Sequence, residues 1–136
     1  MAFEIRGITP LLGVYDMPTA VRFYRDKLGF EVVSTSPVLG DDYFHWVLLR
    51  RGDAEIMLNT NFEFNDERPA LIDQHRNGVH SDTTLYLSCS DVDAAYEESL
   101  GRGVDVKPPV VAHYGMKQMY FLDPDGYGIC FQWPAQ

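Results

Sequence analysis

The chain repeats its own pattern, and this repeat restricts the possible fold more than any single motif does. Residues Val14–Asp16 correspond to Cys89–Asp91 at an offset of 75 positions. Gly29–Val32 correspond to Gly103–Val106 at an offset of 74, so one residue is lost inside the second copy. An internal repeat of this kind predicts two similar structural units in the 136-residue chain.

The first copy predicts a strand, a helix and three further strands. The segment 16–28 is expected to be a helix, because its apolar side chains recur at helical spacing. Asp16 is the expected N-cap, and Gly29 stands where a helix commonly ends in a left-handed residue. The tripeptide RGD is expected to form a tight turn between the last two strands. The strands are expected at 11–14, 30–36, 43–50 and 54–60.

The second copy predicts the same order of elements. Asp91 is expected to cap a helix over 92–103, and the strands are expected at 83–89, 104–112, 116–122 and 126–133. We therefore expect an α+β fold of two βαβββ modules. Module 1 covers about 7–60, a polar linker with a short helical turn near 69–77 covers 61–82, and module 2 covers 83–134.

The acidic stretch Asp-Pro-Asp-Gly, residues 123–126, has two interpretations. In a calcium loop of the helix–loop–helix type, Gly is the sixth residue and Glu the twelfth. Counted from Asp123, Gly126 is the fourth residue and Pro134 the twelfth, so this spacing fails. A type I turn favours Asp first, Pro second and Gly fourth. The stretch is therefore predicted to be the turn of a hairpin.

Composition narrows the functional classes. No apolar run approaches the ~18 residues that span a membrane, and the N-terminus lacks a signal-peptide pattern, so we expect a cytoplasmic protein that binds no membrane. The net charge is −9 without a cluster of Lys and Arg, which argues against a nucleic-acid partner. Cys89 and Cys130 are expected to be buried, reduced thiols.

Three stretches in this order carry a family resemblance: AVRFYRDKLGFEVV, DVDAAYEESLGRGVDV and YGMKQMYFLDPDGYG. Together they resemble the vicinal oxygen chelate superfamily, which includes glyoxalase I, bleomycin resistance proteins and extradiol dioxygenases. The resemblance extends over residues 9–133. It implies that the curled mixed sheets of two modules surround a cup-shaped ligand cleft, and that the chain forms a homodimer.

The resemblance also implies four positions at which metal-dependent members place ligands, usually His, Gln or Glu. In this chain the four positions hold Thr9, Met57, Thr84 and Cys130. Two His and a carboxylate would be needed for a facial triad, and a neutral Thr is a poor ligand. None of the four histidines of the chain stands at these positions. We therefore expect no metal and no cofactor.

Alternation along the strands, started from these four positions, predicts which side chains face the cleft. An apolar and aromatic cleft with a few amides and hydroxyls suits a small organic molecule. The competing interpretation is that these side chains only pack, because strands are rich in aromatic residues. The predicted cleft residues are Thr9, Leu11, Trp46, Met57, Asn59, Thr84, Tyr86, Tyr114, Met116, Tyr120, Cys130 and Gln132.

No nucleophile–base pair, phosphate-binding loop or C-x-x-C motif stands out in the sequence. The first hypothesis is a metal-independent binding protein resembling bleomycin resistance proteins, which sequesters an organic ligand. The second is an enzyme of the superfamily, a lyase, isomerase or oxygenase that uses a divalent metal. The third is a non-catalytic association module. The metal content of the purified protein discriminates best between the first two.

Overall fold

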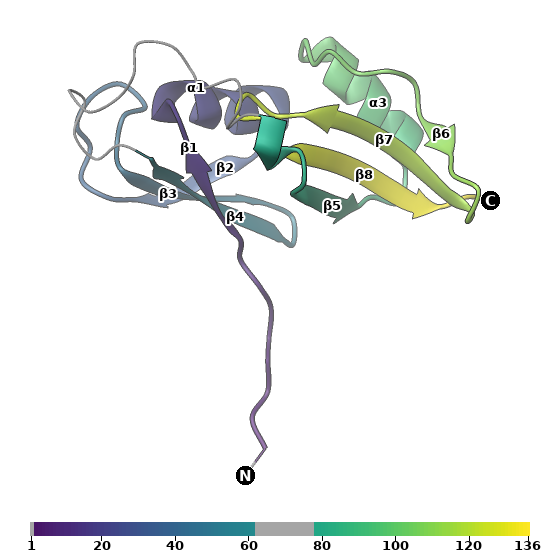
Figure 1. The fold of residues 1–136 in the computed structure, drawn as a ribbon, viewed down its shortest axis with the longest axis horizontal. Helices are drawn as coiled ribbons and strands as arrows, with labels where there is room; N and C mark the ends of the chain where they lie inside the picture. Colours follow the sequence, from purple (N-terminus) through teal and green to yellow (C-terminus); the bar gives the residue numbers. More distant parts are fainter. Residues whose placement is uncertain (1, 62–77) are drawn as a thin grey trace.

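The computed structural model describes residues 2–61 and 78–136, which form two four-stranded mixed sheets (Figure 1). The helices of the two halves lie on the same side of the sheets, and the N-terminal residues extend away on the other side. The α+β fold of two βαβββ modules is thereby confirmed. No helix in the described ranges is long and apolar enough to cross a bilayer.

The first sheet has the strand order β1-β4-β3-β2, in which β1 runs parallel to β4 and the other pairs are antiparallel. Its elements are β1 (Leu11–Val14), α1 (Met17–Arg22), the π-helical segment η1 (Phe23–Lys27), β2 (Glu31–Thr35), β3 (Trp46–Arg51) and β4 (Ala54–Thr60).

The second sheet repeats this topology as β5-β8-β7-β6, with β5 parallel to β8 and the remaining pairs antiparallel. Its elements are β5 (Thr84–Ser88), α3 (Val92–Gly101), β6 (Val110–Val111), β7 (Met116–Leu122) and β8 (Gly128–Pro134). The predicted helical turn near 69–77 lies outside the described residues.

The registers of the two sheets show how the repeat maps onto structure. Leu11 pairs with Met57 in the first sheet, and Tyr86 pairs with Cys130 in the second. Leu11 and Tyr86 are separated by the offset of 75 that relates the start of the two copies. Met57 and Cys130 are therefore structurally equivalent, as the repeat predicted.

The first helix begins as predicted but does not stay α-helical. The side chain of Asp16 accepts a hydrogen bond from Thr19 N at 3.2 Å and caps the helix. From Phe23 the turn widens, so that Leu28 N donates to Phe23 O at 3.2 Å. Gly29 has φ 73°, the left-handed conformation predicted for the helix end.

Two predicted strands begin three or more residues later than the sequence suggested. The strand expected over 43–50 begins only at Trp46, because the hydroxyl of Ser36 accepts hydrogen bonds from His45 N and Trp46 N, both at 3.0 Å, where the strand begins. The strand expected over 104–112 contains only Val110–Val111. Two consecutive prolines precede it, and proline has no N–H to donate to a sheet.

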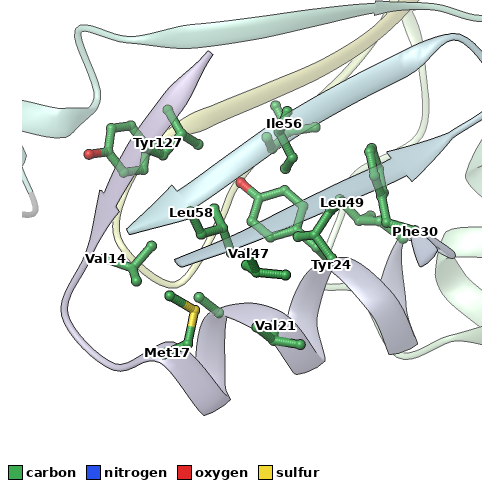
Figure 2. Close-up of a cluster of buried hydrophobic side chains, with 14 of the residues drawn as sticks. Val14, Met17, Val21, Tyr24, Phe30, Val47, Leu49, Ile56, Leu58 and Tyr127 are labelled. Atoms are coloured by element: carbon green, nitrogen blue, oxygen red, sulfur yellow. The ribbon is translucent and has the colours of Figure 1, made fainter. Parts of the chain in front are cut away.

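The core of module 1 is dense. Val47, Leu49, Ile56 and Leu58 lie on one face of β3 and β4 and are at most 5% exposed. They face the apolar stripe of the helix, including Tyr24, which is 1% exposed (Figure 2). This packing leaves the alternate residues of both strands on the opposite face of the sheet.

The Asp-Pro-Asp-Gly stretch is the turn between β7 and β8, as predicted, and we call residues 123–126 the junction turn. Gly126 N donates to Asp123 O at 3.0 Å, which closes the turn. The carboxylate of Asp123 accepts from Asp125 N, from Tyr127 N and, at 2.6 Å, from the hydroxyl of Tyr24. These three donors are hydrogen-bonded to the carboxylate of Asp123. The bond from Tyr24 joins this hairpin turn to module 1.

Three further hydrogen bonds and one stacked pair of rings hold the junction turn. Tyr15 N donates to Asp125 at 2.8 Å, and the Tyr127 hydroxyl donates to Gly13 O at 3.0 Å. The ring of His80 stacks on Tyr127 with centroids 4.3 Å apart. Its Nδ1 lies 2.8 Å from Asp125 O, and because a carbonyl only accepts, Nδ1 carries the proton. The sequence gave no sign that His80 belongs here.

Candidate functional site

Each sheet has one face covered by its helix and one that is not, and we call the latter the open face. On the second sheet the open face is aromatic. Tyr86 on β5 is 58% exposed and Tyr120 on β7 is 50% exposed. Large apolar rings exposed to this extent are suited to contact a ligand or another chain.

Cys130 lies between these two tyrosines. It pairs in register with Tyr86 on one side and with Tyr120 on the other, and it is 1% exposed. Burial raises the pKa of the Cys130 thiol above its usual value. Burial thus disfavours the thiolate, which is the form of cysteine that acts as a nucleophile or metal ligand.

Gly128 allows Tyr120 to lie close to the sheet. A side chain at position 128 would come within 2.6 Å of both the Thr84 hydroxyl and the Tyr120 hydroxyl. The glycine therefore makes room for the tyrosine ring, whose hydroxyl is brought next to Thr84. Thr84 pairs in register with Gly128, so three of the neighbouring strands contribute to this part of the face.

A polar network extends the open face of module 2. The Nε2 atom of Gln118 donates to Tyr114 Oη at 2.8 Å and to Gln132 Oε1 at 2.9 Å. Tyr114 and Gln132 were predicted as cleft residues, and the network brings them together. Gln118 was not among the predicted cleft residues, although it lies two residues from both Met116 and Tyr120, which were predicted. Residues two apart on a strand share one face.

The open face of module 1 contains the remaining predicted strand residues, Leu11, Trp46, Met57 and Asn59. Trp46 pairs with Asn59 and Leu11 with Met57. Asn59 Nδ2 donates to Thr60 O at 3.1 Å, so part of its amide is used within its own strand. Arg50 and Glu55 pair in register on this same face, so it carries charged groups beside its apolar side chains.

A hollow of about 330 Å³ lies where the two modules meet, and we call it the junction hollow. Thr84 and Tyr86 line it together with Ile8 and Pro10, the neighbours of Thr9. Glu55 adds a carboxylate, which accepts a hydrogen bond from Arg50 at 3.2 Å. Trp46 is not among the residues that line this hollow, so the predicted residues form two groups.

The structure places weak metal ligands at the four positions derived from the resemblance. Met57 offers a thioether, Cys130 a buried thiol, and Thr9 and Thr84 offer neutral hydroxyls. Within residues 2–61 and 78–136, no group of three or more His, Cys, Asp or Glu side chains is arranged to hold an ion. The histidines at 45, 80 and 113 lie beside tyrosine rings.

The two cysteines differ in a way that the sequence did not predict. Both are free thiols, and Cys130 is buried as expected. Cys89 is only partly buried, because it follows the edge strand β5 and lies in a second groove beside α3. Its thiol donates a 3.4 Å hydrogen bond to Asp91 O at the start of that helix.

Comparison with known families agrees with this architecture. The sequence profile of the Glyoxalase/Bleomycin resistance protein/Dioxygenase superfamily matches residues 8–131, which is most of the chain. No curated protein matches the sequence significantly.

Solved structures give the same result. The chain is similar to a bleomycin resistance determinant encoded on the transposon Tn5, with a TM-score of 0.71, 20% identity, and coverage of 97% of this chain and 100% of that one. A bleomycin-binding protein in complex with bleomycin gives 0.68 and 20%, covering 94% and 98%. An antibiotic-binding protein from a Streptomyces species gives 0.67 and 25%, covering 98% and 100%.

Proposed function

The chain belongs to the Glyoxalase/Bleomycin resistance protein/Dioxygenase superfamily, and we propose that it is a binding protein that sequesters a small organic molecule without a metal and without turnover. One observation carries the proposal. The positions equivalent to metal ligands hold Met57 and the buried Cys130, while the tyrosines on both sides of Cys130 remain about half exposed.

The chemistry of the open face of module 2 indicates the kind of ligand. Tyr86 and Tyr120 offer rings for stacking on a planar group. Gln118 donates its two amide N–H groups to Gln132 and Tyr114, which leaves the carbonyl of Gln118 and the amide N–H groups of Gln132 for a ligand. This pattern fits a planar aromatic molecule that carries an amide or a similar donor–acceptor group.

Charge adds a preference for cations. The chain has a net charge of −9, and an acidic surface raises the local concentration of a cationic ligand. Glu55 and Asp53 line the junction hollow, although Glu55 is partly neutralised by Arg50. The relatives whose solved structures bind bleomycin or another antibiotic support the same class of ligand for this chain.

The experiment that tests the proposal is a titration with bleomycin and a panel of planar aromatic compounds, in which each cation has a neutral analogue. Tryptophan fluorescence reports binding, because Trp46 and Trp133 lie on strands of the two sheets. We expect cations to bind more tightly than their neutral analogues, with a difference that shrinks as salt is added. Mass spectrometry of the recovered ligand should show it unchanged.

Two results contradict this function. If no compound of the panel binds, the open faces have another use and the association-module hypothesis leads. If a bound compound is recovered chemically altered, the protein is an enzyme. A metal requirement for that alteration would identify it as a metal-dependent member of the superfamily.

A further inference from the structure

Two hydroxyl groups converge on one point of the open face of module 2. The Thr84 Oγ1 atom and the Tyr120 Oη atom each lie 2.6 Å from the place where a Cβ atom of residue 128 would stand. The two oxygens are therefore no more than twice 2.6 Å apart. Within residues 2–61 and 78–136, neither hydroxyl takes part in a hydrogen bond. We call these two groups the hydroxyl pair.

Glycine at position 128 makes this arrangement possible. The backbone of Gly128 does not adopt a positive φ, unlike that of Gly126 two residues earlier, so its conformation does not require a glycine. The requirement is for space, because a Cβ atom would stand too close to both hydroxyls. The hydroxyl of Tyr120 on β7 can therefore reach over Gly128 on β8 towards Thr84 on β5.

Module 1 builds the same sheet without this notch. Met57 is equivalent to Cys130, and Glu55 precedes Met57 by two residues on β4. Glu55 therefore occupies in module 1 the position that Gly128 occupies in module 2. The residue that pairs with Met57 on β3 is Leu48, which has no hydroxyl. The fold of the repeat thus imposes neither the glycine nor the hydroxyl pair.

The open face of module 2 is arranged in rows across β5 and β8, with the hydroxyl pair at one end, aromatic rings in the middle and amides at the other end. Consecutive rows are two residues apart, which is about 6.6 Å along a strand. A planar ring system stacked on the middle row therefore brings its edge next to the hydroxyl pair. The register pairs of the three rows are Thr84 with Gly128, Tyr86 with Cys130, and Ser88 with Gln132.

A single acceptor oxygen can reach both members of the hydroxyl pair. Hydrogen bonds from hydroxyl donors are about 2.5–3.0 Å long, so one acceptor can join two donors whose oxygens are up to about 5–6 Å apart. A carbonyl oxygen has two lone pairs and accepts both bonds. A ligand N–H has one proton and would use only one hydroxyl. The geometry therefore favours a carbonyl oxygen at this place.

We propose that the hydroxyl pair binds a carbonyl oxygen on the edge of a planar aromatic ligand, and that this carbonyl selects the ligand among planar cations. The proposal rests on the binding function proposed above. The ring stacks on Tyr86, while the carbonyl accepts hydrogen bonds from Thr84 and Tyr120. Thr84 and Tyr86 also line the junction hollow, together with Asp53 and Glu55, so a cationic substituent of the same ligand is stabilised there.

A matched pair of probes tests the proposal: an aminomethyl-fluorenone and the aminomethyl-fluorene with the amine at the same ring position. Both are planar cations, and they differ only in the carbonyl. We expect isothermal titration calorimetry to show that the fluorenone binds wild type roughly tenfold more tightly, because it adds two hydrogen bonds. Tyr120→Phe and Thr84→Val should each weaken fluorenone binding roughly threefold or more, and should change fluorene binding little.

Tyr96→Phe and Thr35→Val are the matched controls. They remove the same two kinds of hydroxyl from α3 and β2, outside the open face of module 2. Both should keep the wild-type preference for the fluorenone. Gly128→Ala fills the notch with a methyl group and should lower the preference without removing either hydroxyl. Circular dichroism and melting of each variant show that it is folded.

A spectroscopic measurement separates hydrogen bonding from indirect effects. Infrared difference spectra with an isotope-labelled carbonyl isolate the C=O stretch of the bound fluorenone. We expect this band at a lower frequency in wild type than in Tyr120→Phe or Thr84→Val, because hydrogen bonds weaken the C=O bond. The control variants should give the wild-type frequency.

The outcomes distinguish this proposal from the function on which it rests. If both probes bind wild type equally well, or if neither variant of the hydroxyl pair moves the carbonyl band, the hydroxyl pair does not select the ligand, although the binding function stands. If neither probe binds wild type, this proposal and the proposed class of ligand are both contradicted.

Discussion

Module 1 and module 2 share a backbone plan but distribute their side chains differently. The equivalent residues Leu58 and Phe131 show this: Leu58 is fully buried, whereas Phe131 is only partly buried. On the open faces, Leu11 and Met57 of module 1 correspond to Tyr86 and Cys130 of module 2. Module 1 therefore contributes more of the packed core, and module 2 exposes more aromatic rings on its open face.

The junction turn attaches module 2, which has the smaller core, to module 1. Its contacts reach residues of module 1 that are far away in sequence, such as the bond between Asp123 and Tyr24. Burial, followed by the charge of Asp123, raises the pKa of the Tyr24 hydroxyl well above its usual range, so this hydroxyl remains a donor. One repeat thus supplies more of the buried core, and the contacts of the junction turn attach the other repeat to it.

The largest expected effect is on the core of module 1. Leu58→Ala should lower the free energy of unfolding by roughly 2–5 kcal/mol, because it leaves a cavity in a fully buried cluster. The equivalent Phe131→Ala should cost less, because the ring is only partly buried. Urea unfolding of both variants measures the difference. Equal losses would show that the two modules contribute equally to the core.

The second effect concerns the junction. Tyr24→Phe removes the hydroxyl that donates to Asp123 at 2.6 Å and leaves a buried carboxylate oxygen without that donor. We expect a loss of roughly 1–3 kcal/mol in urea unfolding. Tyr86→Phe is the control, since it removes a hydroxyl from a half-exposed ring. A Tyr24→Phe variant as stable as the control would mean that the junction turn does not hold the modules together.

The third effect separates the open faces. Gln132→Ala should weaken ligand binding by roughly 1–3 kcal/mol if the ligand loses a partner, with little change in the free energy of unfolding. Asn59→Ala changes the equivalent position of module 1, whose amide already donates to Thr60 O, so it should weaken binding less. Fluorescence titrations alongside urea melts distinguish the two. Unchanged affinity in a folded Gln132→Ala variant would remove Gln132 from the site.

The sequence predicted the elements of the fold better than their relation to each other. The bounds of β4 and β7 agree with the predicted strands, because uninterrupted alternation marks both ends. The internal repeat predicted the equivalence of Met57 and Cys130, which the two registers confirm. It did not reveal that Tyr24 bonds to Asp123, because a contact across 99 positions depends on how the modules pack.

The candidate site could be predicted only in part for the same reason. Parity along a strand identified the open-face residues of each sheet, but it does not place two sheets relative to one another. Whether Trp46 and Tyr86 share one cleft depends on how the two sheets are placed relative to each other. In the structure Tyr86 lines the junction hollow and Trp46 does not. The partial exposure of Cys89 likewise depends on the groove beside α3, which forms between modules.

A fourth, smaller effect is a contrast in pH dependence between two carboxyl groups. Hydrogen bonds from Arg25 and then from Arg22 lower the pKa of Asp42 in module 1, whereas burial raises the pKa of Asp123 at the junction. A carboxyl group whose pKa is lowered in the folded state stabilises the fold at pH values above its unfolded-state pKa. This stabilisation is lost as the pH falls through the folded-state pKa. A carboxyl group whose pKa is raised in the folded state stabilises the fold at pH values below its unfolded-state pKa. This stabilisation is lost as the pH rises through the folded-state pKa.

The variants Asp42→Asn and Asp123→Asn measure this contrast. At neutral pH, Asp42→Asn should cost about 1 kcal/mol or less, since the pair is near the surface, and the difference from wild type should vanish in acid. Relative to Asp123→Asn, wild type should gain stability as pH falls through the raised pKa. Urea melts from neutral pH to about pH 3 span the unfolded value of Asp near 3.9. If the difference in stability between wild type and variant changed with pH in the same direction for both variants, the assignment would be contradicted.

The smallest expected effect is that of added metal, and it tests whether either module keeps a ligand at the equivalent positions. A metal that binds the native state and is present at about 100 times its dissociation constant would add about 2.7 kcal/mol to the free energy of unfolding. We expect Ni²⁺, Zn²⁺, Mn²⁺ and Fe²⁺ to add far less. The reason is that Met57 offers only a thioether, and that burial disfavours the thiolate of Cys130.

Thermal melts of wild type and Cys130→Ser, each with and without the four ions, make the measurement specific. A rise in melting temperature that disappears in Cys130→Ser would show that the thiol loses its proton to a metal despite its raised pKa. The function proposed above would then lose its main support. Stoichiometric divalent metal that survives dialysis against a chelator would do the same. If neither protein responds, the open face of module 2 binds its ligand through its tyrosine rings and amide groups. These groups are what distinguishes it from the open face of module 1.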